Sequence, residues 1–216
     1  MLVEIWSDVV CPWCYIGKRR FEGALERFSH AAEVEVRWRS FELDPNAPRR
    51  ENGDNAARLA RKYGITLDEA TQRQARVTAT AASEGLEFHL EHSGRANTFD
   101  AHRLLHLAVG HGRQDQLKER LLRAHLCEGD HVGEPEVLLR LAVEVGLDPD
   151  EVDQVLRTED YRDEVRADER RADELGVSGV PFFVVDGRYA VSGAQDGRRL
   201  AQLLDRVWLD SRAVQA

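Results

Sequence analysis

Residues 9–17 read Val9-Val10-Cys11-Pro12-Trp13-Cys14-Tyr15-Ile16-Gly17, and they join a short apolar segment to a segment with helical periodicity. Proline favours the first position of a helix, because its φ angle is already helical and its missing N–H would be unpaired there. Cys11 then caps the helix, and Cys14 lies about one turn further along, near enough for the two sulfurs to form a disulfide. The stretch therefore predicts a strand, a reactive cysteine pair and a helix, in that order.

The position of Cys11 also predicts its chemistry. Free amide groups of the first helical turn and the positive end of the helix dipole face a capping side chain. Both stabilise a thiolate, so we expect the pKa of Cys11 to lie below the ~8.5 of a free cysteine. Cys11 is the candidate nucleophile and Cys14 the resolving thiol, with Pro12 and Trp13 completing the motif. A stabilised thiolate favours the reduced form and makes the couple more oxidising.

Two other interpretations of the cysteine pair remain open. A structural zinc site would need two more ligands, and the eight histidines show no standard zinc spacing, so no metal is predicted. Two inert core cysteines are disfavoured by the proline at the helix start. The third cysteine, Cys127, is expected to be an unreactive, half-buried thiol. A third redox partner and a thiol that links two copies of the chain are the alternatives for Cys127.

Periodicity predicts the elements on either side of this motif. Residues 2–6 and 33–39 have strand patterns, and a helix runs between them from Pro12 to about residue 28. A helix at 159–175, a β-hairpin at 180–191 with an Asp186-Gly187 turn, and a helix at 196–209 close the chain. Between these parts we expect helices stopped by glycines, at 54–63, 67–84, 97–110, 113–127, 135–145 and 149–157.

This order predicts the fold class. Without the central helical block, the elements follow the order β-α-β-α-β-β-α, which is that of a thioredoxin fold: a central mixed β-sheet flanked by helices. The chain is therefore predicted to be α/β, with a large all-α insertion. We place the thioredoxin-like domain at residues 1–45 and 158–216, and the helical insertion domain at residues 46–157.

Composition limits the partners and the compartment. The formal net charge of −9 disfavours nucleic acid as a partner, because it repels phosphate. No apolar run approaches the ~18 residues needed to span a membrane, so no membrane partner is predicted. The first residues do not have the cationic and apolar pattern of a signal peptide. Three cysteines are too few for a small secreted fold that is held together by disulfides. We therefore expect a cytoplasmic protein.

Two stretches of the chain closely resemble the DsbA-like thioredoxin-fold oxidoreductases, specifically their cytoplasmic FrnE-type branch. They are residues 9–17 and Val177-Ser178-Gly179-Val180-Pro181-Phe182-Phe183-Val184. Weaker matches to the helical insertion of that branch are Asn97-Thr98, Ala101-His102-Arg103-Leu104, Glu128-Gly129 and Pro135-Glu136-Val137-Leu138. The resemblance implies that the Val180–Pro181 bond is cis and lies against the cysteine pair. The backbone of Val180 would then offer a short edge to an extended substrate.

One position departs from the wider thioredoxin pattern. Many thioredoxin-fold enzymes carry a buried carboxylate six residues before the first cysteine, where this chain has Ile5. Asp8 is nearer in sequence, but we expect it to be solvated like most loop acids. The group that takes the proton of Cys14 is thus open: a water could serve, and His102 is the candidate residue. The alternative for His102 is a partly buried helix residue without a catalytic role.

The leading function is a thiol–disulfide oxidoreductase or isomerase that passes through a mixed disulfide. Its substrate would be a protein or small-molecule thiol or disulfide, with glutathione as a candidate co-substrate and no other cofactor. Phe41, Asn97 and Thr98 are candidate pocket residues, although core packing for Phe41 and helix capping for the other two explain them equally well. A homodimer is also left open.

Two other functions compete with it. The first is a glutathione-dependent isomerase or transferase of the 2-hydroxychromene-2-carboxylate isomerase and kappa-class type. Those relatives hold glutathione with a serine where this chain has Cys11. The second is a non-catalytic, redox-gated binding protein that meets its partner through the acidic segment 134–175.

Overall fold

The computed structural model describes residues 1–51 and 53–213. Within these ranges four strands form one mixed sheet in the order β2-β1-β3-β4. Strand β1 is parallel to β2 and antiparallel to β3, and β3 is antiparallel to β4. The bounds are Leu2–Ser7 for β1, Glu35–Ser40 for β2, Phe182–Val185 for β3 and Tyr189–Ser192 for β4. The predicted α/β class with a mixed central sheet is confirmed.

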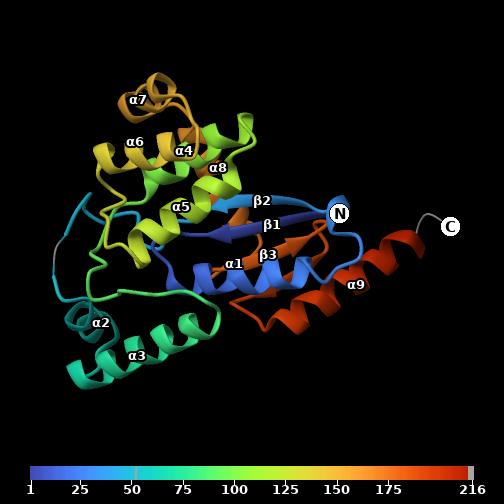
Figure 1. The fold of residues 1–216 in the computed structure, drawn as a ribbon, viewed down its shortest axis with the longest axis horizontal. Helices are drawn as coiled ribbons and strands as arrows, with labels where there is room; N and C mark the ends of the chain where they lie inside the picture. Colours follow the sequence, from blue (N-terminus) through green and yellow to red (C-terminus); the bar gives the residue numbers. More distant parts are fainter. Residues whose placement is uncertain (52, 214–216) are drawn as a thin grey trace.

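Helices cover both faces of the sheet (Figure 1). On one face, Val3, Ile5 and Phe183 pack against α1 (Pro12–Leu25) and α9 (Gly197–Ala213). On the other face, Trp6 and Val184 pack with Ala172 of α8 (Arg162–Glu174). Successive residues of a strand point to opposite faces, so β1 contributes to both layers of the core.

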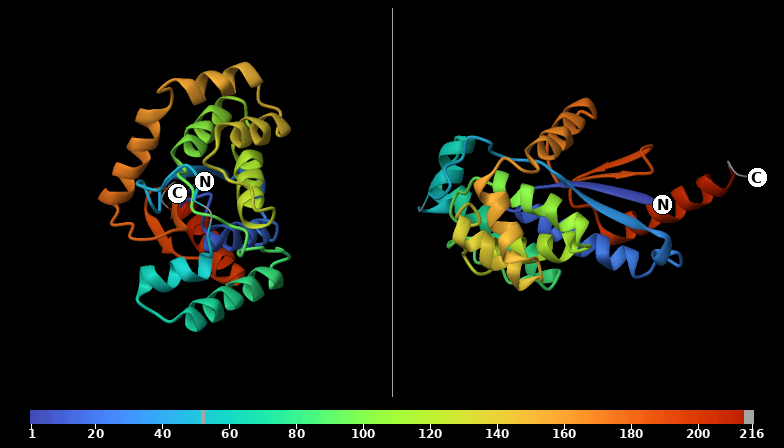
Figure 2. Two further views of the ribbon diagram at one scale, coloured as in Figure 1. Left: turned by 90° about the vertical axis from the view of Figure 1, so that its left-hand side faces the viewer. Right: turned by 90° about the horizontal axis from the view of Figure 1, so that it is seen from above.

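The other helices lie between β2 and α8 in the sequence. They are α2 (Asn55–Tyr63), α3 (Leu67–Ser83), α4 (Phe99–Gly110), α5 (Gln114–Leu126), α6 (Pro135–Glu144) and α7 (Pro149–Arg157). Each bound lies within two residues of the predicted one. Figures 1 and 2 show these helices gathered toward the end of the sheet where β1 and β2 finish. Val9, just before the cysteine pair, is part of their core. The domain boundaries at residues 46 and 157 stay a prediction.

The local signals explain why these helices begin and end where they do. Asp54 accepts hydrogen bonds from the first amides of α2, and Gly64 ends that helix with a left-handed φ of 62°. Thr66 and Glu69 form a capping box at the start of α3.

The C-terminal hairpin has the predicted turn. Asp186 and Gly187 both have positive φ, 49° and 66°, as a type I′ turn requires. The strand begins at Phe182 rather than at Val180, because Pro181 has no N–H to give to a ladder. No helix in the described ranges is both long and apolar enough to cross a bilayer.

Candidate active site

The two cysteines of the motif lie at the start of α1, at the end of the sheet where β1 finishes. Cys11 caps the helix in an extended conformation and Pro12 takes the first helical position. The Cys14 amide donates to the Cys11 carbonyl oxygen over 3.1 Å. Both are free thiols, and we call them the dithiol. Cys11 is 5% exposed, Cys14 is fully buried and Trp13 is 43% exposed, so Cys11 is the outer sulfur.

The loop before β3 meets the dithiol. The Val180–Pro181 bond is cis, which confirms the prediction. The Cys11 thiol donates a hydrogen bond to the Val180 carbonyl oxygen over 3.7 Å. The reactive end of α1 is therefore in contact with the backbone that the resemblance implied for substrate binding.

The proton distribution in the dithiol differs from the expectation. A hydrogen bond to the Cys14 thiol, followed by burial and the negative charge of Cys14, raises the pKa of Cys11 well above its usual value. The amide of Cys14 offsets only part of this effect. The prediction of a lowered pKa for Cys11 is therefore wrong in this dithiol, because helix-end effects are weaker than desolvation and the neighbouring sulfur.

Cys14 holds the anion more readily than Cys11. Burial acts to raise the pKa of Cys14, but the hydrogen bond from Cys11, the positive charge of Lys118 and the Ser7 hydroxyl together lower it. The Ser7 hydroxyl is buried and has no hydrogen-bond partner among the described residues, so it is available to the Cys14 sulfur. When one of the two thiols ionises, these effects favour the charge on Cys14 and the proton on Cys11.

Asp8 is not the solvated loop acid that the sequence suggested. Its side chain is buried and accepts hydrogen bonds from the amides of Val9 and Leu43, at 2.7 and 2.8 Å. Its Oδ1 lies 3.3 Å from Nε2 of His102. Burial acts to raise the pKa of Asp8, but the His102 contact, the Leu43 amide and the positive charge of Lys118 together lower it. Asp8 is therefore held as a carboxylate behind the dithiol.

His102, in the first turns of α4, lies beside Asp8. It is fully buried, its Nε2 bonds to Asp8, and its Nδ1 has no partner among the described residues. Burial lowers the pKa of His102 despite that carboxylate. A role of His102 as the proton acceptor of Cys14 stays a prediction.

The three candidate pocket residues have different places. Phe41 packs beside Val180 in the cluster under β3, which places it near the substrate edge but also in the core. Asn97 accepts a hydrogen bond from the Phe99 amide over 3.1 Å, as a capping residue does. Thr98 is buried at the cap of α4. Capping thus accounts for the Asn97 side chain, and a pocket role stays a prediction.

Sequence reasoning missed Lys118, a buried lysine of α5. Its Nζ donates to the Ser7 carbonyl oxygen over 3.0 Å and lies 5.6 Å from the centre of the Trp38 ring. Spacing could have identified it: Lys118 falls on the same helix face as Leu117, Leu121 and Leu122, all fully buried.

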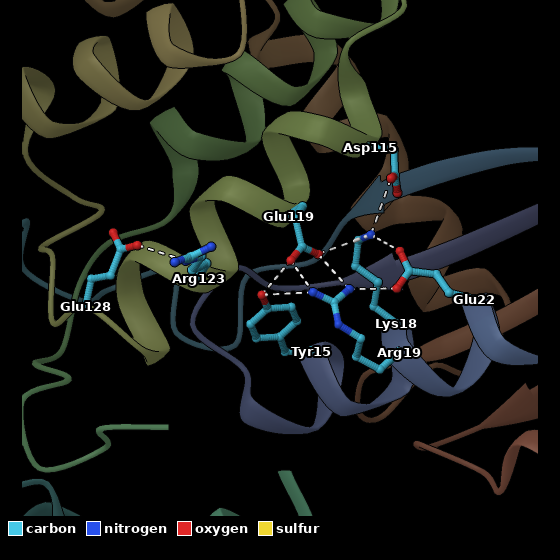
Figure 3. Close-up of polar contacts among 8 residues, drawn as sticks. All are labelled: Tyr15, Lys18, Arg19, Glu22, Asp115, Glu119, Arg123 and Glu128. Carbon is cyan, nitrogen blue, oxygen red and sulfur yellow. Dashed lines mark hydrogen bonds and ion pairs between the residues drawn. The ribbon is translucent and has the colours of Figure 1, made fainter. Parts of the chain in front are cut away.

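Ion pairs fix α5 against α1 beside this lysine (Figure 3). Arg19 pairs with Glu119, and Tyr15 donates to the same carboxylate over 2.6 Å. Lys18 lies 3.3 Å from both Asp115 and Glu119. These ion pairs join α5 to α1 on either side of Lys118 in the sequence.

Cys127 has the surroundings of an unreactive thiol. It is half-buried beside the cluster that contains Tyr15 and Leu86. Burial raises the pKa of Cys127 to about 11, so it is protonated at neutral pH. Among the described residues no three histidine, cysteine or acidic side chains gather as a metal site.

Comparison with known proteins agrees with this geometry. A model of the DSBA-like thioredoxin domain family matches residues 2–205. The chain belongs to this family. A probable DsbA oxidoreductase from Streptomyces coelicolor is 46% identical, with a TM-score of 0.92, over 96% of this chain and 90% of its own. The predicted resemblance to DsbA-like thioredoxin-fold oxidoreductases is thus confirmed.

More distant solved structures share the fold. The cytosolic disulfide reductase DsbM from Pseudomonas aeruginosa, solved with GSH, is 19% identical, with a TM-score of 0.66 over 99% of both chains. A 2-hydroxychromene-2-carboxylate isomerase is 15% identical, with a TM-score of 0.67 over both whole chains. At these identities the DsbA-like chain shares the architecture with them and nothing finer.

Proposed function

We propose that this DsbA-like protein is a thiol–disulfide oxidoreductase or isomerase that works through a mixed disulfide at Cys11. The observation that carries the proposal is the place of the Cys11 sulfur, 3.7 Å from the Val180 carbonyl oxygen, with a second thiol one turn along α1. Cys11 is the outer sulfur and so the one that a substrate meets first.

The hydrogen bond between the two sulfurs supplies the first step. As Cys11 attacks a substrate disulfide, its proton passes to the Cys14 sulfur, which holds the anion more readily. One substrate sulfur bonds to Cys11 and the other leaves as a thiolate. Cys14 then loses the proton and attacks Cys11, and the second substrate thiolate leaves. Two electrons pass to the substrate, and the reverse sequence oxidises a dithiol.

The backbone of Val180 beside Cys11 favours a protein or a small-molecule thiol as the substrate. An extended chain could bond to the backbone of Val180 in place of the Cys11 thiol. Glutathione is the proposed small co-substrate, since the DsbM relative was solved with it. A cytoplasmic location, as in that relative, is part of the proposal.

Two variants test the function, each in a Cys127→Ser background that removes the third thiol. Cys11→Ser should abolish insulin reduction, because no sulfur remains to attack. Cys14→Ser should leave a mixed disulfide on Cys11 that mass spectrometry detects. If both variants keep full activity, the proposal is wrong.

The same assay separates the isomerase alternative. A glutathione-dependent isomerase turns over without net thiol consumption, whereas an oxidoreductase consumes one disulfide for each turnover. Isomerase turnover that survives Cys11→Ser, without exchange activity in the parent protein, would replace our proposal.

A further inference from the structure

Lys118 is a buried cation without a carboxylate partner. It is fully buried, and no acidic group lies within ion-pair distance of it among the described residues. Lys18, which is also buried, contacts the three carboxylates Glu22, Asp115 and Glu119. An unpaired buried charge is strongly unfavourable, so a fold that keeps one has an anion for it in some state.

The dithiol can supply that anion. Among the groups that favour the charged form of Lys118, Cys14 acts most strongly, ahead of Asp8 and Cys11. Asp8 is already satisfied by two amides and His102. The carbonyl of Ser7, which accepts the Lys118 hydrogen bond, belongs to the same residue whose hydroxyl faces the Cys14 sulfur.

We propose that Lys118 is the charge partner of Cys14, the buried ammonium that stabilises the Cys14 thiolate as it resolves the mixed disulfide. This assignment rests on the proposed function and adds a residue from the inserted helices to its machinery. Lys118 acts through Cys14 and is therefore a positioning residue.

In the resolving step, Cys14 displaces the substrate from Cys11. Cys14 has taken the proton of Cys11 in the first half-reaction and must release it, to water or to the departing substrate thiolate. The electron pair of Cys14 then forms the bond to the Cys11 sulfur. The bond from Cys11 to the substrate breaks, and its pair leaves on the substrate sulfur. Lys118 lowers the free energy of the thiolate between these events.

The charged neighbours agree with this role. The Cys14 sulfur is faced by the Cys11 thiol, the Ser7 hydroxyl, the Asp8 amide and Lys118. Lys118 is faced by the two sulfurs and Asp8, which favour its charge, and by Lys18, which opposes it. Burial lowers the pKa of Lys118 to about 8, so it is still mostly charged at neutral pH.

Ellman's reagent tests the assignment in a single turnover. In a Cys127→Ser background, one equivalent gives two releases of the yellow thiolate: Cys11 attacks first, and Cys14 displaces the second. Lys118→Gln keeps a hydrogen-bond donor for Ser7 but removes the charge. We expect its second release to be about tenfold slower, as for a Cys14 pKa raised by about one unit. The pH midpoint of the second release should rise by the same amount.

Two further variants control the experiment. Lys18→Gln removes the other buried lysine, which is already paired with carboxylates and opposes the charge of Lys118, so it should not slow the second release or raise its pH midpoint. Lys118→Met removes the charge while keeping the length of the side chain, so it should match Lys118→Gln. It serves as the second test if the glutamine variant does not fold.

The possible outcomes distinguish a failure of the proposed function from a failure of the role assigned to Lys118. If the parent protein shows only the first release, Cys14 does not resolve the mixed disulfide and the proposed function fails. If the parent shows both releases and either Lys118 variant keeps the same second rate and midpoint, the function stands and the role of Lys118 is overturned. A midpoint that shifts equally in Lys18→Gln would also overturn it.

Discussion

Gly17 of α1 lies directly against the ring of Pro181: a Cβ atom built at Gly17 would be 2.8 Å from the proline Cγ. That distance leaves no room for a methyl group. Gly17 therefore allows α1 to approach the loop before β3, and this approach brings the Cys11 sulfur to the Val180 carbonyl.

Gly17→Ala should destabilise the protein and slow thiol–disulfide exchange. Overpacking of this kind costs about 1–3 kcal/mol, and relief requires that α1 and the proline loop move apart. Urea unfolding measures the first effect and insulin reduction the second.

Gly23→Ala, on the same helix, is the matched control. No atom outside its own helical turn lies within 4 Å of a Cβ at Gly23. Alanine is the better helix former by about 1 kcal/mol, so this variant should be more stable with unchanged activity. If both alanine variants gain stability, the contact between Gly17 and Pro181 is not tight.

Cys14→Ala should lower the pKa of Cys11. The hydrogen bond to the Cys14 thiol is the largest cause that raises it, and the negative charge of Cys14 adds to it. Without that thiol, iodoacetamide should label Cys11 faster at mildly acidic pH in a Cys127→Ser background. A labelling profile that is unchanged, or moved to higher pH, would refute this account of the dithiol.

Asp8→Asn should destabilise the fold by about 1–3 kcal/mol at neutral pH, because a buried charged acceptor is lost. Asp8 and His102 touch, so a double-mutant cycle with His102→Gln should give a coupling energy of at least about 0.5 kcal/mol. Because the pKa of Asp8 is lowered in the folded state, the stability that Asp8 contributes is fully present above the ordinary pKa of an aspartate. That stability is lost as the pH falls from there through the lowered pKa. Purely additive effects in urea unfolding would show that the pair is not coupled.

Glu42→Gln should change how stability depends on pH. Burial raises the pKa of Glu42 to about 7, with Glu169 adding to the shift and Arg166 opposing it. Between the ordinary pKa of a glutamate and about 7, Glu42 is therefore protonated in the folded state and ionised in the unfolded state. The free energy of unfolding consequently falls as the pH rises through that window. The variant should gain unfolding free energy relative to the parent between about pH 5 and pH 8. A constant difference would contradict the raised pKa.

The fold could be predicted from local signals in the sequence. Thr66 with Glu69, Gly64 and the Asp186-Gly187 turn fix helix ends and a hairpin by chemistry that acts over a few residues. The sequence alone did not require the cis Val180–Pro181 bond, which came from the resemblance to a family. Long-range packing selects that isomer, and no short pattern encodes it.

The surroundings of the dithiol were harder to predict. A loop acid and a helical lysine are usually solvated, yet Asp8 and Lys118 are buried because residues far along the chain close over them. The proton distribution between Cys11 and Cys14 depends on the same distant groups. Helix-end reasoning used only the first turn of α1, and so it assigned the anion to the wrong sulfur.

The pairing of β1 with β3 joins residues near the start of the chain to residues 182–185. During translation, the dithiol leaves the ribosome long before the Val180–Pro181 loop is made. Contacts of such long sequence separation form slowly and late. A nascent chain therefore carries its two thiols without the backbone that meets Cys11, and we expect exchange activity to begin only after the last strands have been synthesised.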